Sequence, residues 1–202
     1  INTVSSKIMG AMGQAKTSYY ATNAEEAQIQ QSKSKETVAK NSAEQIVNNL
    51  IQETSGINDV DKIKQLIARI DTPEELKEVN RLLTLKGYPP TDKYSAIENY
   101  IYQEANNSIV HTYNSSDYLE QTVQKWIQNG TLKGQAANEA QARMAARVLY
   151  DGGDGFGTNC EKIKKAVRLI KCPKPTGNRQ ADNKQAREVY RLVNNFIKKH
   201  NT

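Results

Sequence analysis

A glycine-rich segment near residue 155 contains the residue types best suited to hold an ion. Gly153, Gly155 and Gly157 alternate with one acidic and one aromatic residue, and Thr158 follows. Glycine lets neighbouring backbone carbonyls converge on one point, and calcium takes about six to eight hard oxygen ligands. The segment is not an EF-hand, because Phe156 stands where that loop requires glycine. Two interpretations stay open: a calcium-binding loop, and a plain helix connector with Thr158 as a cap.

A basic C-terminal region is the second feature that could do chemistry. Residues 160–202 hold twelve Lys and Arg against three Asp and Glu, a balance of +9, whereas the whole chain carries +6. Such an end favours an acidic partner: anionic phospholipid, another acidic surface or, less favoured, nucleic acid. An ordinary solvated face is the alternative. The residues expected to contact an anionic surface are Lys162, Lys164, Lys165, Arg168, Lys171, Lys174 and Arg179.

Side chains for catalysis or for a zinc site are sparse. Cys160 and Cys172 would lie too far apart along one helix for a disulfide. His111 and His200 have no Cys, Asp or Glu partner at ligand spacing. We therefore expect no enzyme. The mean hydropathy of −0.75 excludes a transmembrane segment. The first twenty residues also lack the basic segment followed by an apolar segment that is typical of a signal peptide. The localisation of the protein therefore stays open.

Tyrosine dominates the aromatic residues, with ten Tyr against two Phe and one Trp. Tyrosine combined with basic residues is typical of surfaces that stack nucleobases. The clustered tyrosines nevertheless lie far in the sequence from the basic end, which argues against a stacking groove and favours helix packing with the hydroxyl in water. These clustered residues are Tyr100, Tyr102, Tyr113 and Tyr118.

The elements that would position these residues are helices. Apolar residues recur at helical spacing from about residue 41 onward, and no segment alternates with period two for long enough to form a sheet. Thr72, Pro73 and Glu75 form a capping box with proline at the first helical position, and Thr158 with Glu161 repeats the box. The sequence therefore predicts an all-α fold with helices at 41–54, 59–70, 73–86, 93–106, 117–129, 138–151, 159–171 and 181–199.

The first forty residues differ from the rest of the chain. They are rich in Ser, Ala, Gln, Asn and Lys and have few large apolar side chains. Residues 24–40 favour helix by propensity but have almost nothing to bury. We therefore expect 1–40 to be a polar helical arm that binds a protein partner or a neighbouring subunit, or else frays.

An internal repeat connects the two halves of the remaining chain. Residues 61–70 align with 161–170, and residues 76–83 align with 186–193 in the same order. These eighteen aligned positions hold eight identities. The repeat predicts a first unit of five helices at 41–130 and an incomplete second unit of three helices at 138–202.

This plan resembles the annexin repeat. The glycine segment, 153–158, is similar to that family's loop between its first two helices, and 72–80 is similar to the opening of its third helix. The start of its fifth helix is similar to 116–118. The resemblance implies a fold of helical repeats and calcium-mediated binding to phospholipid. Carried over by position, Gly153, Gly155 and Gly157 would offer carbonyls in the second repeat, and Glu104 would offer the completing carboxylate in the first.

Two functional hypotheses follow for this chain. The first is a non-enzymatic binding protein that attaches to anionic phospholipid or another acidic surface through the basic C-terminal region and the glycine-rich loop, with or without calcium. The second is a structural or assembly component, for example of a virion or a secreted machine, that docks on protein or nucleic acid. Binding of the isolated chain to vesicles separates the two hypotheses.

Overall fold

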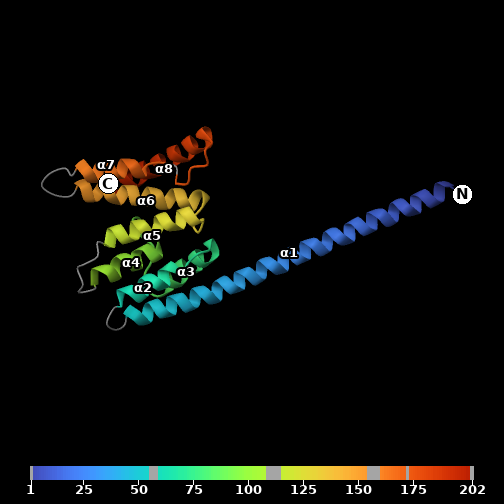
Figure 1. The fold of residues 1–202 in the computed structure, drawn as a ribbon, viewed down its shortest axis with the longest axis horizontal. Coiled ribbons are helices and arrows are strands. Elements are labelled where there is room, and N and C mark those ends of the chain that lie inside the picture. The colour runs from blue at the N-terminus through green and yellow to red at the C-terminus, as the bar shows by residue number, and fades with distance from the viewer. Residues whose placement is uncertain (1, 55–58, 108–114, 154–159, 172, 201–202) are drawn as a thin grey trace. The chain divides into compact units, whose positions relative to one another are not determined.

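The computed structural model describes residues 2–54, 59–107, 115–153, 160–171 and 173–200. These residues form eight helices and no strand, as Figure 1 shows, so the prediction of an all-α fold is confirmed. In chain order the helices are α1 (Asn2–Thr54), α2 (Val60–Ala68), α3 (Pro73–Leu85), α4 (Ala96–Asn107), α5 (Ser115–Asn129), α6 (Gly134–Gly153), α7 (Cys160–Leu169) and α8 (Arg179–His200).

The chain divides into two compact units, residues 1–41 and residues 42–202. The sequence predicted a polar helical arm at 1–40 followed by a separate helix from residue 41. The arm is helical, but it continues without a break into the next segment, so that α1 runs from Asn2 to Thr54. No proline or glycine interrupts the chain between Gly13 and Thr54, and the polar residues there still favour helix. In the first unit the described side chains at 25–38 are exposed.

The start of α3 follows its predicted capping box. The Thr72 hydroxyl accepts a hydrogen bond from the Glu75 backbone N–H at 3.2 Å, and Pro73 begins the helix. The Glu75 carboxylate accepts in turn from the Thr72 hydroxyl and from the Asp71 backbone N–H, each at 3.3 Å. These bonds satisfy amides of the first turn that have no partner within the helix.

Glycine ends the same helix. Gly87 has a φ of +97°, a left-handed conformation that favours glycine. Its N–H bonds the Thr84 carbonyl, and the Tyr88 N–H bonds the Leu83 carbonyl at 3.0 Å. This pair of bonds stops α3 and turns the chain toward α4.

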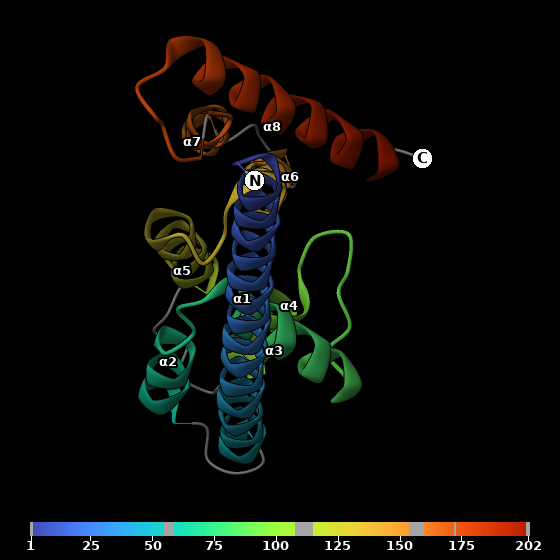
Figure 2. The same ribbon diagram turned by 90° about the vertical axis from the view of Figure 1, so that its right-hand side faces the viewer.

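One hydrophobic core joins the helices of the second unit. Within this core, α6 packs against α5, α7 and α8, and α4 packs against α3 and α5. Figure 2 shows α7 and α8 on the same side of α6. Two buried hydrogen bonds link segments that are far apart in the sequence. Tyr100 donates from its hydroxyl to the Leu50 carbonyl at 3.0 Å, and Trp126 donates from its indole N–H to the Ile70 carbonyl at 3.1 Å.

The later half of the predicted repeat has similar surroundings in its two copies. In α3, Val79 and Leu83 are fully buried, and their aligned counterparts in α8, Val189 and Val193, are also buried. An ion pair is reproduced as well, because the pairs Glu78–Arg81 and Glu188–Arg191 each join their charged atoms at 2.6 Å.

The earlier half of the predicted repeat differs between its copies. Ile67 of α2 is only 1% exposed, whereas the aligned Val167 of α7 is 60% exposed. The buried residues of α7 are Ala166 and Leu169 instead. Helix α7 therefore presents a different face to the core from the one that the alignment predicts. As a result, Val167, which aligns with a buried residue of α2, faces solvent.

Candidate anion-binding surface

Helix α7 lies with one face on α6 and the opposite face in solvent. Gln141 of α6 is fully buried and donates from its amide to the Leu169 carbonyl at 2.7 Å, which fixes the end of α7. The exposed face carries Lys164 and Arg168 beside the exposed Val167, and Lys171 is exposed just beyond the end of the helix. Lys164 lies one helical turn before both Val167 and Arg168, so these two cations share one side of the helix with the aliphatic side chain. We call Lys164, Val167, Arg168 and Lys171 the α7 face.

The predicted contact residues outside this face divide into two groups. Lys162 and Arg179 are exposed. Lys165 instead forms an ion pair with Glu120 of α5 at 2.7 Å, and Lys174 donates to the Gln128 carbonyl at 3.1 Å. Lys165 and Lys174 therefore fasten the C-terminal region to α5.

Helix α8 carries a further row of basic residues that the predicted set missed. Lys184, Arg187, Arg191 and Lys198 are exposed, and their spacing places them along one side of the helix. The first three line a surface depression of about 460 Å³ together with Glu188. Helical periodicity within 179–199 is the sequence signal that would have found this row.

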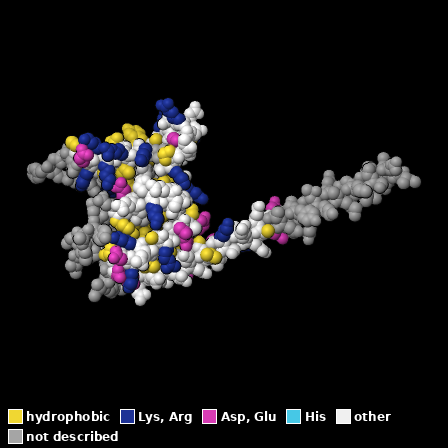
Figure 3. Space-filling model, in the orientation of Figure 1, with side chains coloured by type: hydrophobic (Ala, Val, Ile, Leu, Met, Phe, Trp, Pro, Cys, Tyr) yellow, Lys and Arg dark blue, Asp and Glu magenta, His cyan; other side chains and the backbone are white. Residues whose placement is uncertain are grey.

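The charges of α7 and α8 gather on one part of the surface. Figure 3 shows Lys and Arg side chains over both helices, with few acidic side chains between them. The acidic residues of this region are engaged locally. Glu161 pairs with Lys164 at 2.8 Å, and Asp182 accepts hydrogen bonds from the Thr176 hydroxyl and backbone N–H, each at 2.8 Å. The net positive charge of this part of the surface therefore favours an anionic ligand.

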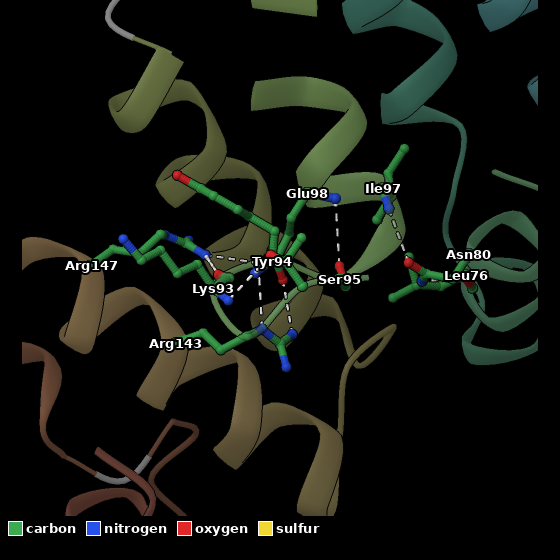
Figure 4. A network of polar contacts seen from close by, with 10 residues as sticks. Leu76, Asn80, Lys93, Tyr94, Ser95, Ile97, Glu98, Arg143 and Arg147 are labelled. Atoms are coloured by element: carbon green, nitrogen blue, oxygen red, sulfur yellow. Dashed lines mark hydrogen bonds and ion pairs between the residues drawn. The ribbon is translucent and has the colours of Figure 1, made fainter. Parts of the chain in front are cut away.

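A buried ionic network holds α6, the helix on which both basic helices rest. The Glu98 carboxylate of α4 pairs with Arg143 at 2.9 Å and with Arg147 at 2.8 Å, as Figure 4 shows. Arg147 also donates to the Lys93 carbonyl at 2.8 Å. Burial alone would raise the pKa of Glu98, but the two arginines outweigh burial and lower that pKa. Glu98 is therefore an ionised anchor between α4 and α6.

The backbone that presents Glu98 is itself fixed by side chains. The Asn80 amide of α3 donates to the Leu76 carbonyl at 2.8 Å, and its oxygen accepts from the Ile97 N–H at 3.0 Å. The first turn of α4 is thus held to α3 on one side and to α6 on the other.

The residues predicted to bind calcium are only partly described. Gly153 is the last residue of α6, and Gly155 and Gly157 lie outside the described residues. Glu104 on α4 accepts a hydrogen bond from the Tyr88 hydroxyl at 2.7 Å, and burial followed by this bond raises the pKa of Tyr88 to about 12. Among the described residues, no three His, Cys, Asp or Glu side chains group closely enough to hold a metal ion.

Two further findings concern the possible binding partner of this basic surface. In the described part of the chain, no helix combines the length and the apolar composition needed to cross a bilayer. Comparison of the sequence and fold with protein-family models, curated proteins and solved structures finds no match. What the chain binds must therefore be inferred from its own surface.

Proposed function

We propose that this chain is a non-enzymatic binding protein that attaches to an anionic phospholipid surface through its basic C-terminal helices. The observation that carries the proposal is the α7 face, where Lys164 and Arg168 flank the exposed Val167 and the exposed Lys171 follows the end of the helix. A cationic helix face with an aliphatic centre suits a bilayer boundary, because the cations meet headgroup phosphates while the aliphatic side chain leaves water.

The charges of the α7 face supply part of the free energy that reversible attachment to a bilayer needs. A Lys or Arg near an anionic bilayer contributes about 1 kcal/mol at physiological ionic strength. The three cations of the α7 face therefore supply at most about 3 kcal/mol, because Lys164 also pairs with Glu161, and the basic row of α8 adds to this when it reaches the same surface. Attachment of this kind weakens with added salt, because counter-ions screen exposed charges over about 8–10 Å.

A sedimentation experiment tests the proposal. The full chain is mixed with vesicles of phosphatidylcholine alone or with about one third phosphatidylserine, and the pelleted fraction is measured across salt concentrations. We expect pelleting only with the anionic vesicles and a decline as salt rises. The triple variant Lys164→Gln, Arg168→Gln, Lys171→Gln should lose it. A matched variant with Lys77, Lys86 and Lys125, which are exposed elsewhere, changed to Gln should keep it. Equal pelleting by the two triple variants would contradict the proposal.

Calcium assistance remains part of the same proposal and has its own test. The glycine-rich loop would supply backbone carbonyls in the second repeat, and Glu104, which also accepts a hydrogen bond from Tyr88, would supply the carboxylate in the first. Vesicle pelleting measured in calcium and in chelator distinguishes calcium-assisted attachment from attachment by charge alone. An increase with calcium that Gly155→Val abolishes would support the loop as a calcium site, and identical pelleting would exclude it.

A second candidate function is an assembly component that docks through its N-terminal arm. The observation that favours it is the first unit itself, where the described side chains at 25–38 are exposed, among them Ile29 and Val38. Long helices gain most of their stability from packing, so such a helix suits a protein partner. Light scattering across protein concentration tests self-assembly. A strictly monomeric chain whose arm cross-links to no partner in its source extract would contradict this function.

A further inference from the structure

An aromatic stack lies where the chain enters α4. Tyr94, just before the helix, and Tyr102, inside it, stack with ring centres 4.7 Å apart and an angle of 22° between their planes. The Arg147 guanidinium lies 4.9 Å from the centre of the Tyr94 ring, a cation–π arrangement that Figure 4 places beside Glu98. We call Tyr94, Tyr102 and Arg147 the stacked platform.

The basic end of the chain reaches this platform in the folded molecule. The Tyr150 hydroxyl of α6 contacts the carbonyls of Phe196 and Ile197 at 3.3 and 3.4 Å, which places the end of α8 beside α6. Lys199 then forms an ion pair with Asp92, two residues before Tyr94. The tyrosines and the basic C-terminal region are far apart in the sequence, which argued against a stacking groove, but the fold brings them close together.

Cations surround the platform at this junction. Lys93 is exposed and holds its ammonium 5.3 Å from the centre of the Tyr150 ring. Lys198 and Lys199 are exposed at the end of α8. Phosphate groups of a ligand beside the platform would therefore meet positive charge from two directions.

The platform is rigid and still has an open side. Arg147 is fixed by Glu98 and by the Lys93 carbonyl, so the cation that lies over Tyr94 does not move freely. Tyr102 is 41% exposed although it packs against Tyr94, so part of this residue remains accessible to solvent. A preformed aromatic surface of this kind binds a planar ring with little loss of conformational freedom.

We infer that the stacked platform binds single-stranded nucleic acid, with a nucleobase on the outer side of Tyr102 and backbone phosphates at Lys93 and Lys198. Base stacking on an exposed aromatic ring next to cations is the chemistry that recognises an unpaired strand. A phospholipid headgroup offers phosphate but has no planar ring to continue the stack. A duplex keeps its base faces inside, so it too lacks the group that the platform would take.

Fluorescence anisotropy of a labelled thymidine 12-mer with the full chain tests this inference. Stacking of one base is worth about 1–3 kcal/mol, so Tyr102→Ala should weaken binding about 5- to 150-fold, while Tyr102→Phe should bind as the parent does. Tyr190 of α8 is 56% exposed and outside the platform, so Tyr190→Ala is the matched control and should change little. Lys93→Gln should lower the slope of log affinity against log salt by about 0.7.

Several results would overturn the inference. These are no binding of the 12-mer by the parent chain, equal losses in Tyr102→Ala and Tyr190→Ala, or equally tight binding of a blunt duplex. Loss of vesicle pelleting in Tyr102→Ala would show that the platform binds lipid, and this result would also overturn the inference. The α7 triple variant keeps the two proposals distinguishable, because it should lose vesicle pelleting but retain the effect of Tyr102→Ala on the 12-mer.

Discussion

Replacing Glu98 by glutamine should destabilise the second unit more than any change of a single surface charge. The carboxylate is 2% exposed and accepts from Arg143 at 2.9 Å and from Arg147 at 2.8 Å. An amide has only one oxygen, so one guanidinium would meet N–H groups instead of an acceptor. Removing one partner from a buried ionic network costs about 3–5 kcal/mol. For a domain of this size that corresponds to a fall of about 6–20 °C in Tm.

Urea unfolding followed by circular dichroism at 222 nm measures the change in free energy. The control is Glu161→Gln, which removes a carboxylate from an exposed pair with Lys164 and should leave the unfolding midpoint nearly unchanged. A loss of less than about 1 kcal/mol in Glu98→Gln would refute the view that this network joins α4 to α6 as an ionised unit.

The pH dependence supplies an independent check on the same group. The pKa of Glu98 is lowered from the ordinary value of 4.5, so its stabilising contribution is complete above that value and is lost as pH falls toward the folded-state pKa. The difference in unfolding free energy between the parent and Glu98→Gln should therefore shrink as pH is lowered below about 4.5. A difference that stays constant from pH 7 to pH 3 would contradict the lowered pKa.

Two further substitutions test local features of the fold. Gly87→Ala should cost about 1–2 kcal/mol of unfolding free energy, because Gly87 has a φ of +97° and the space around it is open, so backbone strain alone is measured. Urea unfolding checks this, and a neutral result would contradict the assigned helix end. Trp126→Phe should cost about 1–3 kcal/mol, because the buried Ile70 carbonyl loses the indole N–H that bonds it at 3.1 Å. Thermal unfolding by circular dichroism checks this second loss, and an unchanged Tm would show that the carbonyl finds another donor.

The helices of the second unit could be predicted from the sequence because local signals mark them. Apolar spacing and the capping box at Thr72 placed α3 at 73–86, and the structure has Pro73–Leu85. The extent of α1 was not predictable in the same way. The apolar pattern begins near residue 41, but a helix continues through polar residues where nothing terminates it.

The surroundings of a predicted face depend on tertiary contacts that spacing does not reveal. Val167 aligns with a buried isoleucine, yet it is exposed because Ala166 and Leu169 face the core instead. The platform around Tyr94 was missed for the same reason. The platform and the cations beside it come from residues 93–102, 147–150 and 198–199, and only folding brings these segments together. The annexin-like plan itself stays a prediction.

The ionic anchor also decides how far the two halves of the chain can be separated. The predicted repeat suggests that a piece ending at residue 130 could be expressed as a module, but Glu98 belongs to that piece and both of its counter-ions belong to α6. Cutting the chain there would remove both cations that hold Glu98 and expose the face of α5 that packs against α6. Any truncation meant to isolate a minimal binding fragment from the N-terminal side must therefore retain α6.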